Sequence, residues 1–181
     1  MGYLTIVVFL VLTGLMMWVF HFQSNVLDYG FAGIDPLFAI APFLYLFLIP
    51  AITMRSLAEE RLTGTIELLL TKPLSEFTIL MAKFLAGLTM VLISLLPTLV
   101  YYVSVYLLGD PVGNIDTGAV IGSYIGMLFL GGAFVAIGLF ASSLSNNQIV
   151  AFIIAALLCA VCYLGFETLC SIPFIGKATL V

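Results

Sequence analysis

Charged residues are scarce in this chain. Lys, Arg, Asp and Glu together make up 8% of the 181 residues, whereas apolar residues make up 64%. An average soluble domain is about half apolar and about a quarter charged, and soluble monomers do not expose apolar surface on the scale that this composition would require. The composition therefore excludes a soluble globular domain and predicts a protein whose solvent is the lipid bilayer.

Metal-ligating residues are also few. The chain has one histidine, His21, and three cysteines, of which Cys159 and Cys162 have the spacing of a CxxC pair inside an apolar run. A structural zinc site needs four ligands, and no further ligands accompany this pair. We interpret both cysteines as small, apolar-tolerant residues on one helix face, and we expect no metal site and no cofactor.

Catalytic motifs are missing as well. A P-loop needs two glycines five residues apart, followed by Lys and Ser or Thr. Around the one Gly-Lys pair, at 176–177, Ser171 and Ala178 stand where the first glycine and the hydroxyl residue would be. No nucleophile is paired with a base in the pattern of a hydrolase, and Glu167 falls at the end of an apolar run. We predict that the chain is not an enzyme and that ATP hydrolysis, if any, belongs to another chain.

Long apolar runs dominate the sequence. A helix needs about 20 residues to cross the roughly 30 Å of hydrocarbon in a bilayer, and five runs are long enough. Strands of a membrane barrel would alternate apolar and polar residues, which these runs do not. We predict an all-α polytopic membrane protein, a single transmembrane domain over 1–181, with spans at about 3–22, 37–54, 79–108, 119–141 and 149–166.

The basic residues indicate the orientation. Four of the five lie within residues 55–83, between the second and third runs, and Lys and Arg are retained on the cytoplasmic side of a membrane. We therefore place this segment and the N-terminus in the cytoplasm. The loops 23–36 and 109–118 carry Asp but no basic residue, so they are expected outside. Lys177 is the one basic residue that this orientation places outside.

Local signals predict where the helices begin and bend. Asp35 followed by Pro36 has the pattern of an N-cap and a first-turn proline. Ser75 with Glu76 predicts a second capped start. The Ser/Asn cluster over 142–147 forms a short turn that offers cap oxygens to the fifth span. Kinks are expected where a proline removes a helical hydrogen bond inside a span: at Pro42, Pro50 and Pro97.

Glycines repeat along the fourth run. Gly118, Gly122 and Gly126 recur every four residues, and three more glycines follow between 131 and 138. A four-residue spacing puts the first three on one helix face, where a second helix backbone can approach closely. We predict helix packing at Gly118, Gly122 and Gly126, against a helix of this chain or of another.

The segment between the second and third runs has helix signals of its own. Ser56 and Glu59 have the spacing of a capping box, which predicts a short helix over 57–62 that Gly64 ends. A second short helix is predicted over 65–71. It ends before Lys72 because a residue that precedes a proline, here Pro73, avoids helical geometry. The segment is therefore predicted as two short helices at the membrane surface.

This segment has two possible interpretations. An amphipathic helix lying in the headgroups is usually rich in Lys and Arg, and acidic side chains such as Glu59, Glu60 and Glu67 are not attracted to an anionic leaflet. A helix with an apolar face can instead be presented to a groove on a soluble partner. The carboxylates favour the second interpretation.

The same segment carries a family resemblance. Residues 54–61 (MRSLAEER) and 63–75 (TGTIELLLTKPLS) resemble the cytoplasmic signature of ABC-2 type exporter permeases, which is an acidic pair, Gly-Thr, Glu-Leu-Leu and Pro-x-Ser before the third span. With LPTL at 96–99, GNID at 113–116 and LSNNQ at 144–148, the chain is most similar to the gliding-motility-associated permease subunits of Bacteroidetes.

The resemblance implies a mechanism and partners. Two permease subunits, identical or different, pair in the bilayer, separate ABC ATPase chains bind beneath them, and no nucleic acid takes part. A coupling segment, here about 55–80, sits in a cleft of the ATPase and passes its movement to the spans. The residues that would carry this ATPase coupling are Glu59, Glu60, Arg61, Gly64, Thr65, Ile66, Glu67 and Leu68.

Two features depart from the family pattern. Members usually have a basic amphipathic helix before the first span, and they usually have six spans, whereas we count five and therefore expect a truncated six-span fold. Two functions stay open. The chain is either an ABC-2 exporter permease subunit, with a link to gliding motility, or a non-transporting scaffold that anchors a motility or secretion complex.

Overall fold

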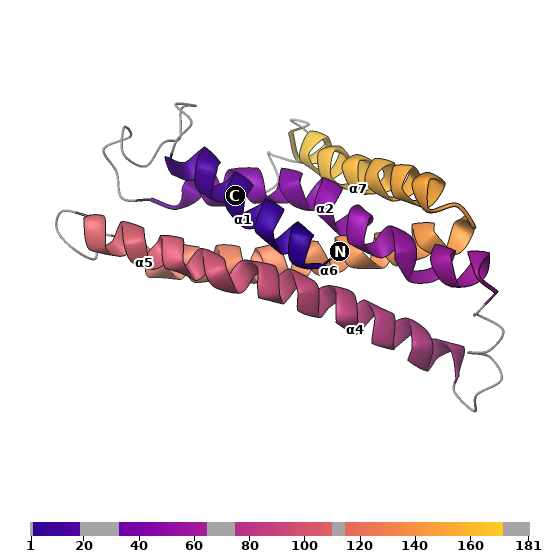
Figure 1. Cartoon of the computed structure of the whole chain (residues 1–181). Helices are drawn as coiled ribbons and strands as arrows, with labels where there is room; N and C mark the ends of the chain where they lie inside the picture. Colours follow the sequence, from indigo (N-terminus) through magenta and orange to yellow (C-terminus); the bar gives the residue numbers. More distant parts are fainter. Residues whose placement is uncertain (1, 19–32, 65–74, 110–114, 172–181) are drawn as a thin grey trace.

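The computed structural model describes residues 2–18, 33–64, 75–109 and 115–171, and every regular element within these ranges is a helix. The elements are α1 (Gly2–Trp18), α2 (Asp35–Leu62), α4 (Glu76–Leu95), the 3-10 helix η1 (Leu96–Thr98), α5 (Leu99–Leu108), α6 (Thr117–Leu144) and α7 (Gln148–Ser171). Because α4, η1 and α5 follow one another without a gap, these ranges form five helical rods (Figure 1).

Four of the rods are long and apolar enough to cross a membrane. They are Asp35–Leu62, Glu76–Leu108, Thr117–Leu144 and Gln148–Phe166. The fifth, α1, is apolar but only 17 residues long. The predicted all-α membrane fold is thereby confirmed. The largest difference from the predicted spans is at α2, which continues eight residues beyond position 54.

The start of α2 also differs from the prediction. Ile34 is its N-cap, Asp35 is already helical, and no side chain caps the first turn. A proline is tolerated throughout a first turn, where no helical donor is needed, so Pro36 does not fix the start to one residue. Two other predicted caps are confirmed. Ser75 Oγ accepts a hydrogen bond from the Thr78 N–H at 3.3 Å, and Asn147 Oδ1 accepts one from the Ile149 N–H at 3.0 Å.

Prolines lie inside two of the rods. Pro42 and Pro50 lie inside α2, and both are buried. Pro97 lies in η1, where the third span changes from α-helical to 3-10 geometry. Since proline cannot donate the backbone hydrogen bond that a continuous helix needs, this change confirms that Pro97 interrupts its span.

The central rod is α2. It packs most extensively against α6 and also contacts α1, α4 and α7. Its buried residues Tyr45 and Ile49 join Phe9 of α1 and Phe134 of α6 in the main apolar core. The Phe9 and Tyr45 rings stack with their centroids 5.0 Å apart. Because packed interiors transmit strain, a displacement of α2 acts on its neighbours on all sides.

Glycines let α6 approach two neighbouring rods closely. A Cβ atom on Gly131 would lie 2.6 Å from Val91 Cγ1 of α4, and one on Gly138 would lie 2.1 Å from Thr53 Oγ1 of α2. Real Cβ atoms do not make contacts this short, so any side chain here would push the helices apart. In the membrane, such small residues replace the hydrophobic effect as the basis of helix packing.

The three glycines predicted to pack a helix lie elsewhere on α6. Gly118, Gly122 and Gly126 are all exposed on the surface of the chain. A Cβ on Gly122 or Gly126 would meet nothing within 4 Å, and one on Gly118 would meet only Asp116 of the same helix start. No other described rod packs on them, so their contact with another chain stays a prediction.

Tyrosine hydroxyls join the rods within the apolar interior. The Tyr45 hydroxyl bonds Ser94 Oγ (3.2 Å), the Tyr124 hydroxyl bonds Thr98 Oγ1 (3.0 Å), and the Tyr101 hydroxyl donates to the Leu10 carbonyl (3.0 Å). These bonds link α2 to α4, α6 to η1, and α5 to α1. In a bilayer each such bond between helices contributes about 1 kcal/mol.

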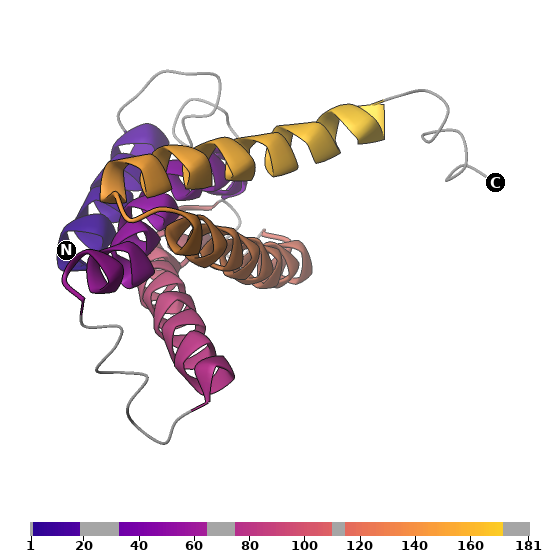
Figure 2. The ribbon, with the colours of Figure 1, turned by 90° about the vertical axis from the view of Figure 1, so that its right-hand side faces the viewer.

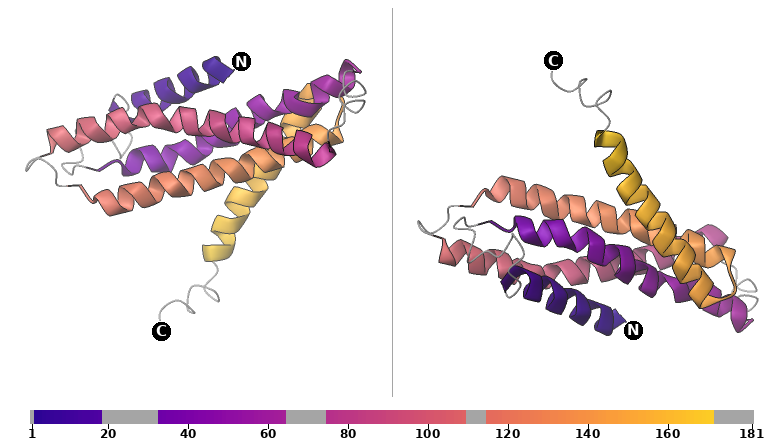
Figure 3. Two further views of the ribbon diagram at one scale, coloured as in Figure 1. Left: turned by 90° about the horizontal axis from the view of Figure 1, so that it is seen from below. Right: turned by 90° about the horizontal axis from the view of Figure 1, so that it is seen from above.

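The last rod, α7, diverges from the others. Figures 2 and 3 show it leaving the bundle after the α6–α7 turn. An apolar groove of about 560 Å³ lies between α6 and α7, and Phe134 and Tyr163 are among its lining residues. Cys159 is buried and Cys162 is exposed toward this groove. The two cysteines, three residues apart on α7, therefore lie on neighbouring positions of the helix surface but differ in burial.

Candidate functional site

The predicted coupling residues begin at the end of α2. Glu59, Glu60 and Arg61 belong to its last turns, and Gly64 follows two residues after the helix ends. The remaining predicted coupling residues, Thr65, Ile66, Glu67 and Leu68, lie outside the described residues. The structure therefore describes the base of the predicted coupling segment.

The separate helix predicted over 57–62 is not formed. The central helix α2 runs without interruption to Leu62, so Ser56 and Glu59 lie inside it and no capping box is present. A Ser-x-x-Glu pattern caps a helix only where the preceding residues leave helical geometry. Neither proline nor glycine occurs within residues 51–63, so nothing in the sequence ends the helix at that point.

Gly64 ends α2 as predicted. Its φ is +70°, and its N–H donates to the Arg61 carbonyl at 3.3 Å. A left-handed glycine directly after a helix caps the last free carbonyls. A Cβ at this position would meet nothing within 4 Å, so glycine is favoured here for its backbone conformation alone.

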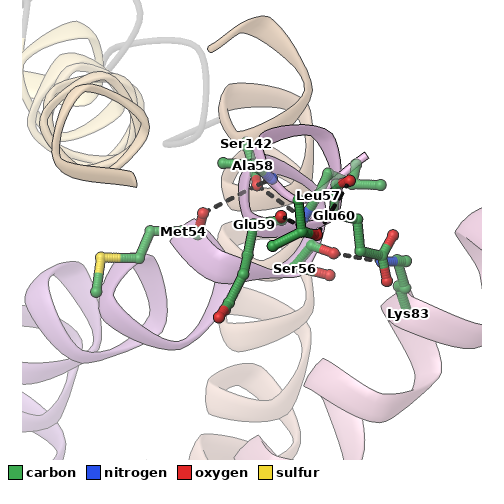
Figure 4. Close-up of polar contacts among 9 residues, drawn as sticks. Met54, Ser56, Leu57, Ala58, Glu59, Glu60, Lys83 and Ser142 are labelled. Atoms are coloured by element: carbon green, nitrogen blue, oxygen red, sulfur yellow. Dashed lines mark hydrogen bonds and ion pairs between the residues drawn. The ribbon is translucent and has the colours of Figure 1, made fainter. Parts of the chain in front are cut away.

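Lys83 of α4 contacts the last turns of α2. Its Nζ lies 2.6 Å from a carboxylate oxygen of Glu60 and also donates to the carbonyl of Ser56 (Figure 4). The Lys83 side chain is 15% exposed and that of Glu60 is 29% exposed. Salt screens a partly buried pair less than an exposed pair, and a cation near a helix C-terminus is favourable. This lysine therefore fixes the end of α2 to α4.

Ser142 of α6 contacts the same turns. Its fully buried hydroxyl accepts from the backbone N–H groups of Leu57 and Ala58 and donates to the carbonyl of Met54, each at 3.1 Å (Figure 4). A serine hydroxyl offers one donor and two acceptor positions, and all three are used. This serine therefore fixes the end of α2 to α6.

Among the described residues, basic side chains lie at one end of the bundle only, whereas carboxylates lie at both ends. The described basic residues, Arg55, Arg61 and Lys83, lie at the end where α2 stops, α4 starts and α6 meets α7 (Figure 3). Asp35 and Asp116 lie at the opposite end, where α2 and α6 start. This distribution is the one expected when the basic end faces the cytoplasm.

Exposed charged side chains lie at the basic end. The Glu59 and Arg61 side chains are exposed there, beside the Lys83 ion pair. Within the described ranges, no three His, Cys, Asp or Glu side chains come close enough to hold a metal ion. The arrangement can bind a charged surface and transmit force along α2.

The comparison with known families now decides the class of protein. The family model for ABC-2 family transporter proteins matches residues 12–177, which is nearly the whole chain. The chain belongs to the ABC-2 transporter family. It is therefore a multi-pass membrane component of an ABC-2 transporter, a type of subunit that is typically non-catalytic and generally pairs with ATPase subunits. Neither a curated protein nor a solved structure gives a significant match.

Two residues of this site were not identified from the sequence. Ser142 was predicted as part of a turn over 142–147, whereas it lies buried inside α6, which ends at Leu144. Its spacing from the buried Val135 and Leu139 continues the buried stripe of α6, and this helical periodicity was the available signal. Lys83 was predicted only as a cytoplasmic charge, because its contact with α2 depends on how α4 packs.

Proposed function

We propose that this chain is the permease subunit of an ABC-2 exporter and that the end of α2 receives the movement of a separate ATPase chain. The observation that supports this most is the anchoring of that end. Lys83 fixes it to α4 and Ser142 fixes it to α6. A load applied at the end of α2 therefore acts on three rods at once, as a coupling element requires.

The predicted coupling residues divide by role. Glu59 and Arg61 are exposed and available to a soluble partner. Glu60 holds the last turn through Lys83, and Gly64 sets the direction in which the chain leaves α2. We assign the ATPase contact itself to the segment that follows, by its resemblance to the coupling helix of the family: Thr65, Ile66, Glu67 and Leu68.

The finer assignments follow from the same reasoning. We place the basic end in the cytoplasm, because Lys and Arg are retained on that side, and the protein in the inner membrane, by its resemblance to ABC-2 exporter permeases. We also propose pairing with a second permease subunit, identical or different. The exposed Gly122 and Gly126 support this pairing, since small residues let helix backbones meet closely.

Binding of an ATPase tests the proposal. The tagged chain is co-expressed with candidate P-loop ATPases of the same genome, and binding is measured in lipid nanodiscs. The combined change Glu59→Ala and Arg61→Ala is expected to weaken binding about tenfold, since it removes two charges at the contact. The control is Asp35→Asn, at the opposite end of the bundle, which should bind normally. Equal affinities for all these proteins would contradict the docking site.

ATP turnover separates a transporter from the alternative, a non-transporting scaffold or anchor. A scaffold would bind its partners without changing the rate of ATP hydrolysis. A permease should change the turnover of its ATPase when the two are reconstituted together. Turnover that is identical with and without the permease, despite binding, would favour the scaffold.

The link to gliding motility rests on the resemblance of the chain to permeases associated with gliding. It predicts that a strain lacking the gene grows normally but no longer spreads on surfaces. Normal gliding of that strain would contradict the link and leave the exporter function intact.

A further inference from the structure

Ser142 commits its whole hydrogen-bonding capacity to the backbone of another helix. A serine inside a helix commonly bonds a carbonyl three or four residues back in its own helix. The neighbouring Ser143 does so, donating to the Phe140 carbonyl at 2.7 Å. Ser142, fully buried, bonds three backbone groups of α2 instead. This is more than packing of α6 against α2 requires.

These three bonds fall within one turn near the end of α2. Pro50 lacks the backbone donor that would bond the Leu46 carbonyl, so the missing helical bond lies before this turn. One turn later, the Met54 carbonyl and the Ala58 N–H are the acceptor and donor of a single helical turn, and the Ser142 oxygen lies 3.1 Å from each. The last two turns of α2, the lever, continue the helix without a break and are held in addition by contacts from α6 and α4.

We infer that Ser142 is a positioning residue that makes α6 follow this lever, the residues 55–62 of α2. The inference rests on the proposed function, in which the lever receives the movement of the ATPase. The neighbouring Gly138 lets the backbone of α6 lie close against Thr53 of α2, so a displacement of one helix acts directly on the other. The hydroxyl then converts a rotation of the lever into a displacement of α6, because its three bonds fix both distance and direction.

The first experiment measures the position of the lever in the permease alone. Spin labels are attached to cysteines placed at Leu62, the exposed end of α2, and at Phe129, an exposed residue of α6, in a chain whose native cysteines are changed to Ala. With a rise of about 1.5 Å per residue, the labels are roughly 20 to 30 Å apart along the helices, which pulsed dipolar spectroscopy resolves.

The expected result separates two adjacent serines. Ser142→Ala should broaden or shift the distance distribution, whereas Ser143→Ala, which removes a bond within one helix, should leave it unchanged. A Ser142→Ala distribution identical to that of the unchanged chain overturns the inference.

The second experiment measures transmission in the complete complex with its ATPase. Ser142→Ala should lower the permease-dependent part of the ATP turnover by about tenfold, as expected for the loss of one to two hydrogen bonds. ATPase binding should stay close to that of Ser143→Ala, and turnover is compared well below the melting temperatures of both variants, so that a loss of stability alone does not explain the loss of turnover. Ser142→Cys keeps a weak donor and acceptor of similar size and should give intermediate turnover.

The two experiments fail independently. A permease that binds no ATPase contradicts the proposed function, while the distance measurement still decides whether Ser142 holds the lever. Unchanged turnover in Ser142→Ala, in a complex whose ATPase does respond to the permease, overturns the inference and leaves the proposed function standing.

Discussion

Replacing Lys83 by Met tests the anchoring of α2 to α4. Methionine keeps an unbranched stem of similar length but removes the charge, so Glu60 loses its lysine and the Ser56 carbonyl loses a donor. Breaking an exposed ion pair costs up to about 1 kcal/mol, and breaking a buried pair costs about 3–5 kcal/mol. The pair here is 15% and 29% exposed. We therefore expect Lys83→Met to lower the free energy of unfolding by about 1–3 kcal/mol.

Equilibrium unfolding in lipid–detergent micelles measures this loss. Glu60→Gln should give a loss of similar size, and the double variant should lose less than the sum of the two, because both changes remove one interaction. Glu59→Gln is the matched control, since this adjacent carboxylate is exposed, and it should change stability by less than about 0.5 kcal/mol. Full additivity of the two changes, or equal effects of Glu59→Gln and Glu60→Gln, would refute the anchoring role of Lys83.

Three further predictions concern other contacts. Tyr101→Phe, which removes the bond to the Leu10 carbonyl, should lower the unfolding free energy by about 0.5–1 kcal/mol; no loss would show that the bond contributes nothing. Gly138→Ala should lower the unfolding free energy by about 1–3 kcal/mol by overpacking. Gly126→Ala should leave the unfolding free energy of the single chain unchanged and weaken only its self-association, measured by crosslinking. Equal losses of unfolding free energy in the two variants would contradict the packing described for α6. Gly64→Ala, at a φ of +70°, should cost about 1 kcal/mol and reduce permease-dependent ATP turnover, and unchanged turnover would count against a role in coupling.

The membrane fold could be predicted because lipid restricts the backbone so strongly. Only helices and closed barrels satisfy every backbone group in a bilayer, so apolar runs of sufficient length located all five rods. Caps with a side-chain oxygen, such as Ser75 and Asn147, could be placed because their hydrogen bonds are local. The left-handed Gly64 was predictable for the same reason.

The arrangement at the end of α2 could not be predicted in this way. The Ser56 and Glu59 pattern suggested a new helix, but the helix already present continued through it. The contacts of Lys83 and Ser142 depend on which faces of α4 and α6 turn toward α2, and this is set by packing between distant segments. In the same way, the spacing of the glycines on α6 did not show which of them face another rod.

The orientation of the basic end is the claim on which the exporter account depends, and labelling from one side of the membrane tests it directly. In a chain without native cysteines, a single cysteine is placed at Leu62, at the exposed end of α2, or at Thr117, at the exposed start of α6. The account predicts that a membrane-impermeant thiol reagent applied to intact spheroplasts modifies the cysteine at 117 and spares the one at 62, and that inside-out vesicles give the reverse. Modification at position 62 in intact spheroplasts, with position 117 spared, would contradict the cytoplasmic position of the coupling end.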